Sequence, residues 1–343
     1  MIRRGSTRVW LLIAAVKTLA GAAAWCVLTL VSVQTPPGKL SPVFYFVLMT
    51  VFVSTGFALV AGARDDGPSR SLGAVFVFFG SFFADPLLAL VAPGTSPGLS
   101  RTLRLLHAAQ PYALTPAFFW QFAWEFPRRQ PGLIAPSVAR AIRDICYYTG
   151  VTLFVALVAH AAVASSAPSE WSNDVLRNVT WVTGALLSMP TVVLLLVKLR
   201  TALPEERSRI RLFIGGILLG SAPVLLDILV GLFVPGFRAY AANPAHKLVL
   251  AKIEAVALLL LPATTAYAVV VDRVLETRFI VRMAIQYAFA RYTVLGAMAI
   301  PALVLISYLY RRRYQPLAEI LWGFSPLTWV AMLAAVALIG WLR

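Results

Sequence analysis

Long apolar stretches alternate with short polar breaks along the whole chain. A helix that crosses a membrane needs about 20 predominantly apolar residues, and stretches of that length recur from one end of the sequence to the other. The pattern predicts about ten transmembrane helices, at residues 9–33, 41–63, 72–92, 105–126, 141–164, 175–199, 210–234, 248–271, 292–310 and 317–342. We therefore expect an all-α fold, a polytopic membrane helix bundle that forms a single domain over residues 1–343.

The fourth stretch, residues 105–126, has the weakest pattern of the ten. Gln110, Pro111 and Pro116 interrupt it. Proline removes a backbone donor and bends or breaks a helix, and such breaks are tolerated inside a membrane only where the freed backbone groups find partners. We expect this segment to be kinked or partly interfacial.

The composition excludes a soluble protein. Hydrophobic residues make up 60% of the chain, charged residues only 13%, and the mean hydropathy is +0.80, whereas a soluble domain has about 25% charged residues. The net charge is +16, which in a soluble protein would suggest nucleic acid. Here the basic residues gather in the breaks between apolar stretches, where they set membrane orientation, so we expect no nucleic-acid partner.

The basic residues favour alternate breaks, which predicts the topology. They cluster at the amino terminus and within residues 64–70, 128–143, 198–211 and 273–291, and such clusters stay in the cytoplasm. Both termini are then cytoplasmic in a bacterial inner membrane. Arg311, Arg312 and Arg313 fall on the outer side in this scheme. Either they are an exception, or the last two segments form a re-entrant pair.

Four ionisable side chains lie inside the predicted spans: Lys17, Asp85, Asp227 and Glu254. A charge at the centre of a spanning helix costs about 2.5–3.5 kcal/mol on insertion scales, so each needs a partner or water. Lys17 lies too deep in its helix to reach the membrane surface easily, and we predict an intramembrane ion pair with Asp85 or with Asp227. Such a pair either fixes the register of the helices or belongs to a ligand or ion site.

His160 is the histidine that lies deepest in an apolar run. It is either a packing residue with a hydrogen-bond partner or a group that contacts a ligand or responds to pH. The candidate ligand-binding residues are therefore Asp85, His160, Asp227 and Glu254.

The sequence contains no motif that indicates an enzyme. It has no nucleophile motif, no phosphate-binding loop and no dinucleotide fingerprint. Neither cysteine, Cys26 or Cys146, has a second ligand at metal or redox spacing. We expect no catalytic residues, no metal and no cofactor, and an intramembrane enzyme is the least favoured class.

Small residues predict places where helices approach closely. Gly216 and Gly220 form a small-xxx-small step, and the run from Ala20 to Ala24 forms a small-residue face. Such faces let helix backbones come near each other in a membrane. We expect both contacts to lie within one chain rather than between two copies.

Three blocks of sequence resemble the membrane region of ComP-like bacterial sensor histidine kinases, a region that is also found fused to serine phosphatase outputs. The blocks are an aromatic helix end with Phe126-Pro127-Arg128-Arg129, then Pro204-Glu-Glu-Arg-Ser-Arg-Ile-Arg211 leading to Gly215-Gly216 and Pro223, and finally Leu261-Pro262, Ala266-Tyr267-Ala268, Arg273-Val274-Leu275, Arg278, Arg282, Gln286-Tyr287-Ala288 and Arg291.

The resemblance implies a basic cytoplasmic linker over residues 272–291. Its Arg273, Arg278, Arg282 and Arg291 would either transmit the signal or hold the linker against anionic lipid. Asp272 departs from the pattern, which favours a neutral or basic residue there. The family continues into a soluble output domain, and because the chain has neither a phospho-accepting histidine box nor ATP-binding glycine motifs, we expect no output domain and no kinase activity in it.

The function that we expect is a sensory membrane module that passes a signal to a cytoplasmic kinase or phosphatase output. Its partners would be membrane lipid, a lipophilic or peptide signal and a second copy of the chain. The alternative is a secondary transporter, because buried charges and proline-broken helices also describe an ion-coupled pathway. No inverted repeat is visible to favour it.

Overall fold

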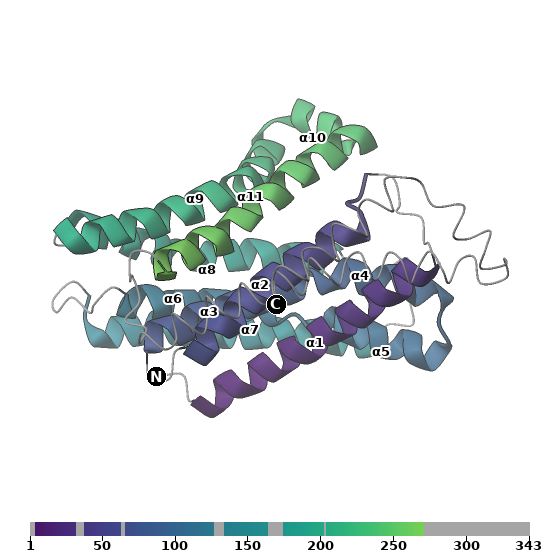
Figure 1. The fold of residues 1–343 in the computed structure, drawn as a ribbon, viewed down its shortest axis with the longest axis horizontal. Coiled ribbons are helices and arrows are strands. Elements are labelled where there is room, and N and C mark those ends of the chain that lie inside the picture. Colours follow the sequence, from purple (N-terminus) through teal and green to yellow (C-terminus); the bar gives the residue numbers. More distant parts are fainter. Residues whose placement is uncertain are drawn as a thin grey trace, which may run out of the picture. The chain divides into compact units, whose positions relative to one another are not determined.

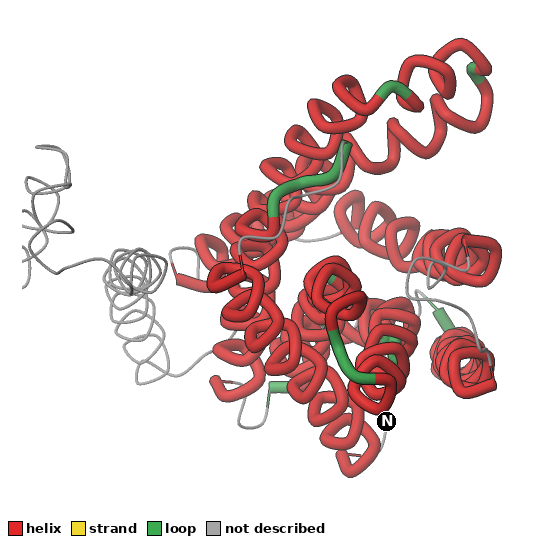
Figure 2. The backbone as a smooth tube through the Cα atoms, turned by 90° about the vertical axis from the view of Figure 1, so that its right-hand side faces the viewer, coloured by secondary structure: helices red, strands yellow, loops and turns green. Residues whose placement is uncertain are grey.

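The computed structural model describes residues 4–31, 38–62, 66–126, 134–163, 174–201 and 204–270. Within them the protein is all-helical, with 93% of residues in helices and no strand, and Figure 2 shows helices joined by short loops. The chain divides into two compact units. The first holds residues 1–28 and 33–282, and the second holds residues 29–32 and 283–343. Of the second unit only residues 29–31, at the end of the first helix, are described.

The described part is a succession of α-helices with two short 3₁₀ helices (Figure 1). In chain order these elements are α1 (Arg4–Val31), α2 (Pro42–Gly62), α3 (Gly67–Phe82), α4 (Ala84–Val91), η1 (Ala92–Gly94), α5 (Pro97–Ala108), η2 (Pro111–Leu114), α6 (Thr115–Glu125), α7 (Pro136–Val163), α8 (Asp174–Thr201), α9 (Pro204–Phe233), α10 (Pro235–Ala242) and α11 (Pro244–Val270).

Six helical stretches of the described residues are long and apolar enough to cross a membrane, which indicates a multi-pass membrane protein. They match six of the predicted stretches and are Ser6–Val31, Pro42–Ala61, Gly67–Val91, Pro136–Val163, Val179–Thr201 and Pro244–Thr265. Helix α9 covers the seventh prediction, and its described apolar part, Ile210–Val224, is shorter. The predicted stretches at 292–310 and 317–342, Arg311–Arg313 and the predicted linker lie outside the described residues.

The weak fourth stretch is a broken helix rather than one span. Helix α5 ends at Ala108, and both Ala109 and Gln110 leave the helical conformation, with ψ angles of 99° and 78°. A residue that precedes proline is disfavoured in the helical region, and Gln110 precedes Pro111. The chain then turns through η2 and resumes as α6. The predicted kink is therefore a complete interruption.

Helix α6 packs mainly against α3, α7 and α8. Its buried side chains are Pro116, Ala117, Phe118, Trp120, Phe122 and Ala123. Trp120 is 2% exposed, and its indole N–H donates to the backbone oxygen of Ala139 on α7 at 2.9 Å. Gln110 and the residues of η2 that follow the break are buried as well, as non-helical backbone at membrane depth requires.

Glycines bring several helix pairs into close contact. A Cβ atom on Gly56 of α2 would lie 2.7 Å from the carbonyl oxygen of Gly73 on α3, and the reverse distance is the same. On α9, a Cβ atom on Gly220 would lie 3.1 Å from the Cβ of Leu261 on α11. The predicted close contact at Gly216 and Gly220 therefore lies within the chain, between α9 and α11, which run side by side in Figure 1.

Several helix ends meet at one end of the first unit, which we call the basic end: the starts of α3, α7 and α9 and the ends of α6 and α8. A Cβ atom on Gly67 would touch the Glu125 carboxylate, Lys198 contacts the last residues of α6, and the ring of Phe213 lies 5.7 Å from that of Phe126. These are the breaks whose basic residues predicted a common membrane side.

Candidate functional site

Lys17 lies at the centre of a buried polar cluster. Its side chain is 0% exposed, and its Nζ atom lies 2.6 Å from Oδ1 of Asp85. Lys17 is in the middle of α1, and Asp85 is in the first turn of α4. Of the two partners predicted for Lys17, the structure places Asp85 beside it.

A glycine allows α1 to approach α4 closely enough for this pair. Gly21 lies one helical turn after Lys17, and a Cβ atom there would lie 2.6 Å from the Cβ of Ala84, the residue before Asp85. Any larger side chain at this position would push the two backbones apart. The small-residue face from Ala20 to Ala24 thus sets the distance that the ion pair needs.

The ammonium group also contacts the end of helix α5. Its Nζ donates to the backbone oxygens of Ala109 at 2.7 Å and of His107 at 3.3 Å, and to Oε1 of Gln110 at 3.2 Å. The last carbonyls of a helix have no partner within it, and a cation there interacts favourably with the helix dipole. Lys17 therefore caps α5 at the break in the fourth stretch.

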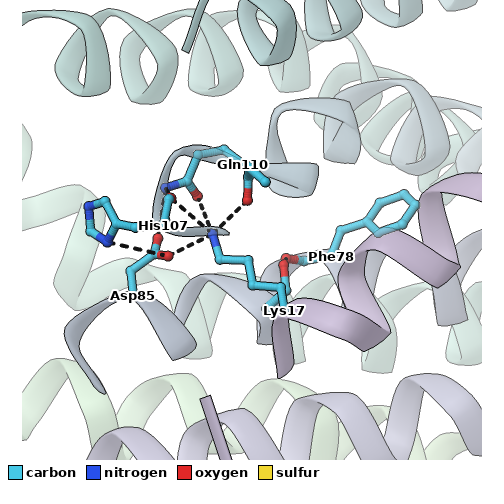
Figure 3. Close-up of polar contacts among 7 residues, drawn as sticks. Lys17, Phe78, Asp85, His107 and Gln110 are labelled. Carbon is cyan, nitrogen blue, oxygen red and sulfur yellow. Dashed lines mark hydrogen bonds and ion pairs between the residues drawn. The ribbon is translucent and has the colours of Figure 1, made fainter. Parts of the chain in front are cut away.

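Gln110 joins two of the groups that contact Lys17, the Asp85 carboxylate and the backbone oxygen of His107. Its Nε2 donates to Oδ2 of Asp85 at 2.8 Å and to the backbone oxygen of His107 at 2.6 Å. The side chain of His107 lies beside the same carboxylate, with Nδ1 3.7 Å from Oδ1 of Asp85. Figure 3 shows Lys17, Asp85, His107 and Gln110 directed toward one another, and we call these four residues the Lys17 cluster.

The contacts of the Lys17 cluster satisfy its charges. Lysine has three N–H donors, and four acceptor atoms surround them. The positive and negative charges balance within the pair, with Oδ1 of Asp85 ion-paired to Nζ of Lys17 and Oδ2 accepting from Gln110. This pairing offsets the cost of about 2.5–3.5 kcal/mol that each charge would otherwise have in a membrane.

The other candidate ligand residues lie outside the Lys17 cluster. His160 is in the last turn of α7 with an exposed side chain, so it is not deep in its helix as its apolar run suggested. Asp227 on α9 and Glu254 on α11 are half-buried on two helices that pack together. The linker residues Arg273, Arg278, Arg282 and Arg291 lie outside the described residues.

Sequence reasoning missed a second buried lysine. Lys198 is near the end of α8 and only 1% exposed. Its position at the edge of an apolar stretch, followed by Arg200, indicated a surface charge at a helix end. His107 and Gln110 were also missed as cluster members, although Gln110 was the one amide that interrupted an apolar stretch beside two prolines.

No metal site is evident in the part of the chain that the structure describes, where no three His, Cys, Asp or Glu side chains gather closely enough to hold an ion. Cys26 and Cys146 do not form a disulfide with each other in the structure; the first is exposed and the second buried. The thiol of Cys146 lies 3.8 Å from the backbone oxygen of Leu187 on α8, which is a packing position.

Comparison with known proteins finds no matching family model, no similar curated protein and no similar solved structure. What the chain does must therefore be inferred from the Lys17 cluster and from the helices that surround it.

Proposed function

We propose that this chain is a membrane-embedded sensory module that passes a signal to a cytoplasmic kinase or phosphatase output. In this proposal about ten helices cross a bacterial inner membrane and both termini are cytoplasmic. The basic end then faces the cytoplasm. The signal is lipophilic or a peptide, and its binding shifts the packing of the helices.

The observation that carries the proposal is the complete burial of Lys17 at a break in a helix. One ammonium group holds together α1, α4 and the end of α5. Because the ammonium group is buried, it cannot replace a lost contact with water. A second arrangement of the helices would therefore have to supply a complete new set of partners for Lys17. A signal can shift such an equilibrium by its differential affinity for the two packings.

A route from the Lys17 cluster to the cytoplasm is available through contacting helices. The break continues into α6, whose Phe122 lies against Phe213 of α9 with ring centroids 4.7 Å apart. Helix α9 packs along α11, which ends at Val270, and in our proposal the basic linker at residues 272–291 follows it. In our proposal Arg273, Arg278, Arg282 and Arg291 pass the change to the output, as the resemblance to ComP-like sensors implies.

A fusion protein tests the proposal directly. The output domain of a well-characterised dimeric histidine kinase, without its own membrane region, is joined after residue 343. Its autophosphorylation rate is measured in lipid nanodiscs for the parent, Lys17→Met and Asp85→Asn. We expect both variants to change the rate severalfold, while Lys39→Met, at an exposed site before α2, leaves it unchanged. Equal rates in all four folded proteins would contradict the sensory role.

The specific observation that favours a transporter instead is the same broken helix, because discontinuous helices with charged groups form the sites of many transporters. The two functions differ in a flux measurement. A transporter in proteoliposomes with a proton gradient moves ions or solute, and Asp85→Asn abolishes that flux. We expect no flux above that of empty liposomes, and a flux that Asp85→Asn abolishes would replace the sensory proposal.

A further inference from the structure

Lys198 binds the far end of α6. Its Nζ atom donates to the backbone oxygens of Ala123 at 2.8 Å, Trp124 at 3.0 Å and Phe126 at 2.7 Å. These are the carbonyls at the end of α6 that lack partners within the helix. A cation at this position is favourable both for its hydrogen bonds and for the helix dipole.

Lys17 and Lys198 therefore perform the same task at two successive helix ends. Lys17, from α1, caps the end of α5, where the fourth stretch breaks. Lys198, from α8, caps the end of α6, where the stretch finishes. Between the two caps lie the four residues of η2 and the 11 residues of α6, a length of about 24 Å.

The segment between the two lysines is closely packed at both of its ends. At its start, a Cβ atom on Gly150 of α7 would lie 2.5 Å from the backbone oxygen of Ala113. Near its end, the rings of Phe122 and Phe126 are stacked with centroids 4.9 Å apart. Tightly packed helices transmit small shifts because their interiors have few alternative arrangements.

We infer that Lys17 and Lys198 are the two ends of one coupling path, and that the helical segment at residues 111–125 moves as a rigid unit between them. Loss of the contacts around Lys17 displaces the start of this segment and weakens the cap that Lys198 forms at the end of the segment. Lys198 is a positioning residue in this path. Because the rings of Phe122 and Phe126 both contact Phe213 of α9, the displacement reaches α9 at the basic end.

The biological role of this coupling rests on the proposed function, but the coupling itself can be measured without any signal. Hydrogen–deuterium exchange is followed by mass spectrometry on the full chain in nanodiscs. Two peptides are compared, one covering residues 103–110 and one covering residues 119–126. The variants are Lys17→Met, Lys198→Met and the matched control Arg200→Met, which removes an exposed charge two residues from Lys198.

We expect Lys17→Met and Lys198→Met each to accelerate exchange in both peptides, by about tenfold near the substitution, which corresponds to about 1.4 kcal/mol, and by a smaller factor at the distant end. Arg200→Met should leave both peptides unchanged. If Lys198→Met fails to fold, Lys198→Arg serves in its place, because a planar guanidinium cannot reproduce the three bonds of a compact ammonium.

The result that overturns the inference is purely local acceleration, in which Lys17→Met affects only residues 103–110 and the Lys198 variant only residues 119–126. This outcome is distinct from failure of the proposed function. A fusion kinase that does not respond to Lys17→Met, together with exchange that changes at both ends, would contradict the sensory role and leave the coupling intact.

Discussion

Lys17 and Asp85 form an ion pair between α1 and α4, with Nζ and Oδ1 2.6 Å apart and side-chain exposures of 0% and 7%. Neither charge can leave without stranding the other in an apolar interior. Removing one partner of a buried pair is strongly destabilising, whereas replacing both with residues of similar volume is often tolerated. The contribution of the pair to the free energy of unfolding therefore depends on both residues being present.

This reasoning predicts a strongly non-additive cycle. Lys17→Met and Asp85→Asn should each lower the free energy of unfolding, Lys17→Met by about 3–5 kcal/mol. The double variant should lose less than the sum of the two. Thermal unfolding of purified protein in one detergent measures all four. A Lys17→Met protein as stable as the parent would contradict the ion pair between Lys17 and Asp85.

Gln110 should matter because it donates to Asp85 and accepts from Lys17. Gln110→Ala leaves a buried carboxylate oxygen with one donor fewer, and such a loss costs about 1–3 kcal/mol. The matched control is Gln121→Ala on α6, whose amide Nε2 donates to Oε1 of Glu125 over a long distance of 3.5 Å. Chemical denaturation should rank Gln110→Ala clearly below Gln121→Ala, and equal stabilities would mean that Gln110 does not hold the cluster together.

Apolar runs predict helices well because a helix that crosses a membrane must be apolar along its whole length. Most predicted segments therefore agree with described helices to within several residues. The position of the break in the fourth stretch was also foreseeable, since Gln110, Pro111 and Pro116 each disfavour a continuous helix. Sequence alone could not say whether the chain would kink there or stop.

Residue pairing was harder to predict, because it depends on which helices touch. Lys17 needed a carboxylate, and its sequence position could not choose between Asp85 and Asp227. The choice depends on Gly21 and Ala84, which bring α1 to α4. Lys198 was overlooked because a lysine near a helix end normally reaches water, whereas here the end of α6 covers it.

Glycine 21 offers a test of how close α1 must lie to α4. Gly21→Ala should destabilise the protein by about 1–3 kcal/mol, because the added methyl group overlaps Ala84. Gly184→Ala is the matched control on α8, where no atom lies within 4 Å of an added Cβ. That substitution should be neutral or stabilising, since alanine favours a helix by about 1 kcal/mol over glycine. Melting temperatures in one detergent compare the two directly.

The outcome that contradicts this packing is a Gly21→Ala protein at least as stable as Gly184→Ala. It would mean that α1 and α4 lie further apart than the structure shows, where a Cβ atom on Gly21 would lie 2.6 Å from the Cβ of Ala84. The ion pair cycle and the glycine pair are independent, since one removes charge and the other adds volume. Agreement between them would establish the contact of α1 with α4 by two different physical effects.

The predicted orientation can be tested with introduced cysteines. Lys39 lies exposed before α2, and Arg140 lies exposed in the first turns of α7 at the basic end. In a background with Cys26 and Cys146 replaced by alanine, each is changed to cysteine and treated in intact bacterial cells with a thiol reagent that cannot cross the inner membrane.

Basic clusters next to spanning helices stay in the cytoplasm, so we expect Lys39→Cys to be labelled in intact cells and Arg140→Cys only after the membrane is opened. The cysteine-free background controls for unspecific labelling. The reverse pattern would place the basic end outside, and the end of α11 with it, because α11 ends on the side where α9 begins. That result would contradict the proposal that a cytoplasmic linker follows α11.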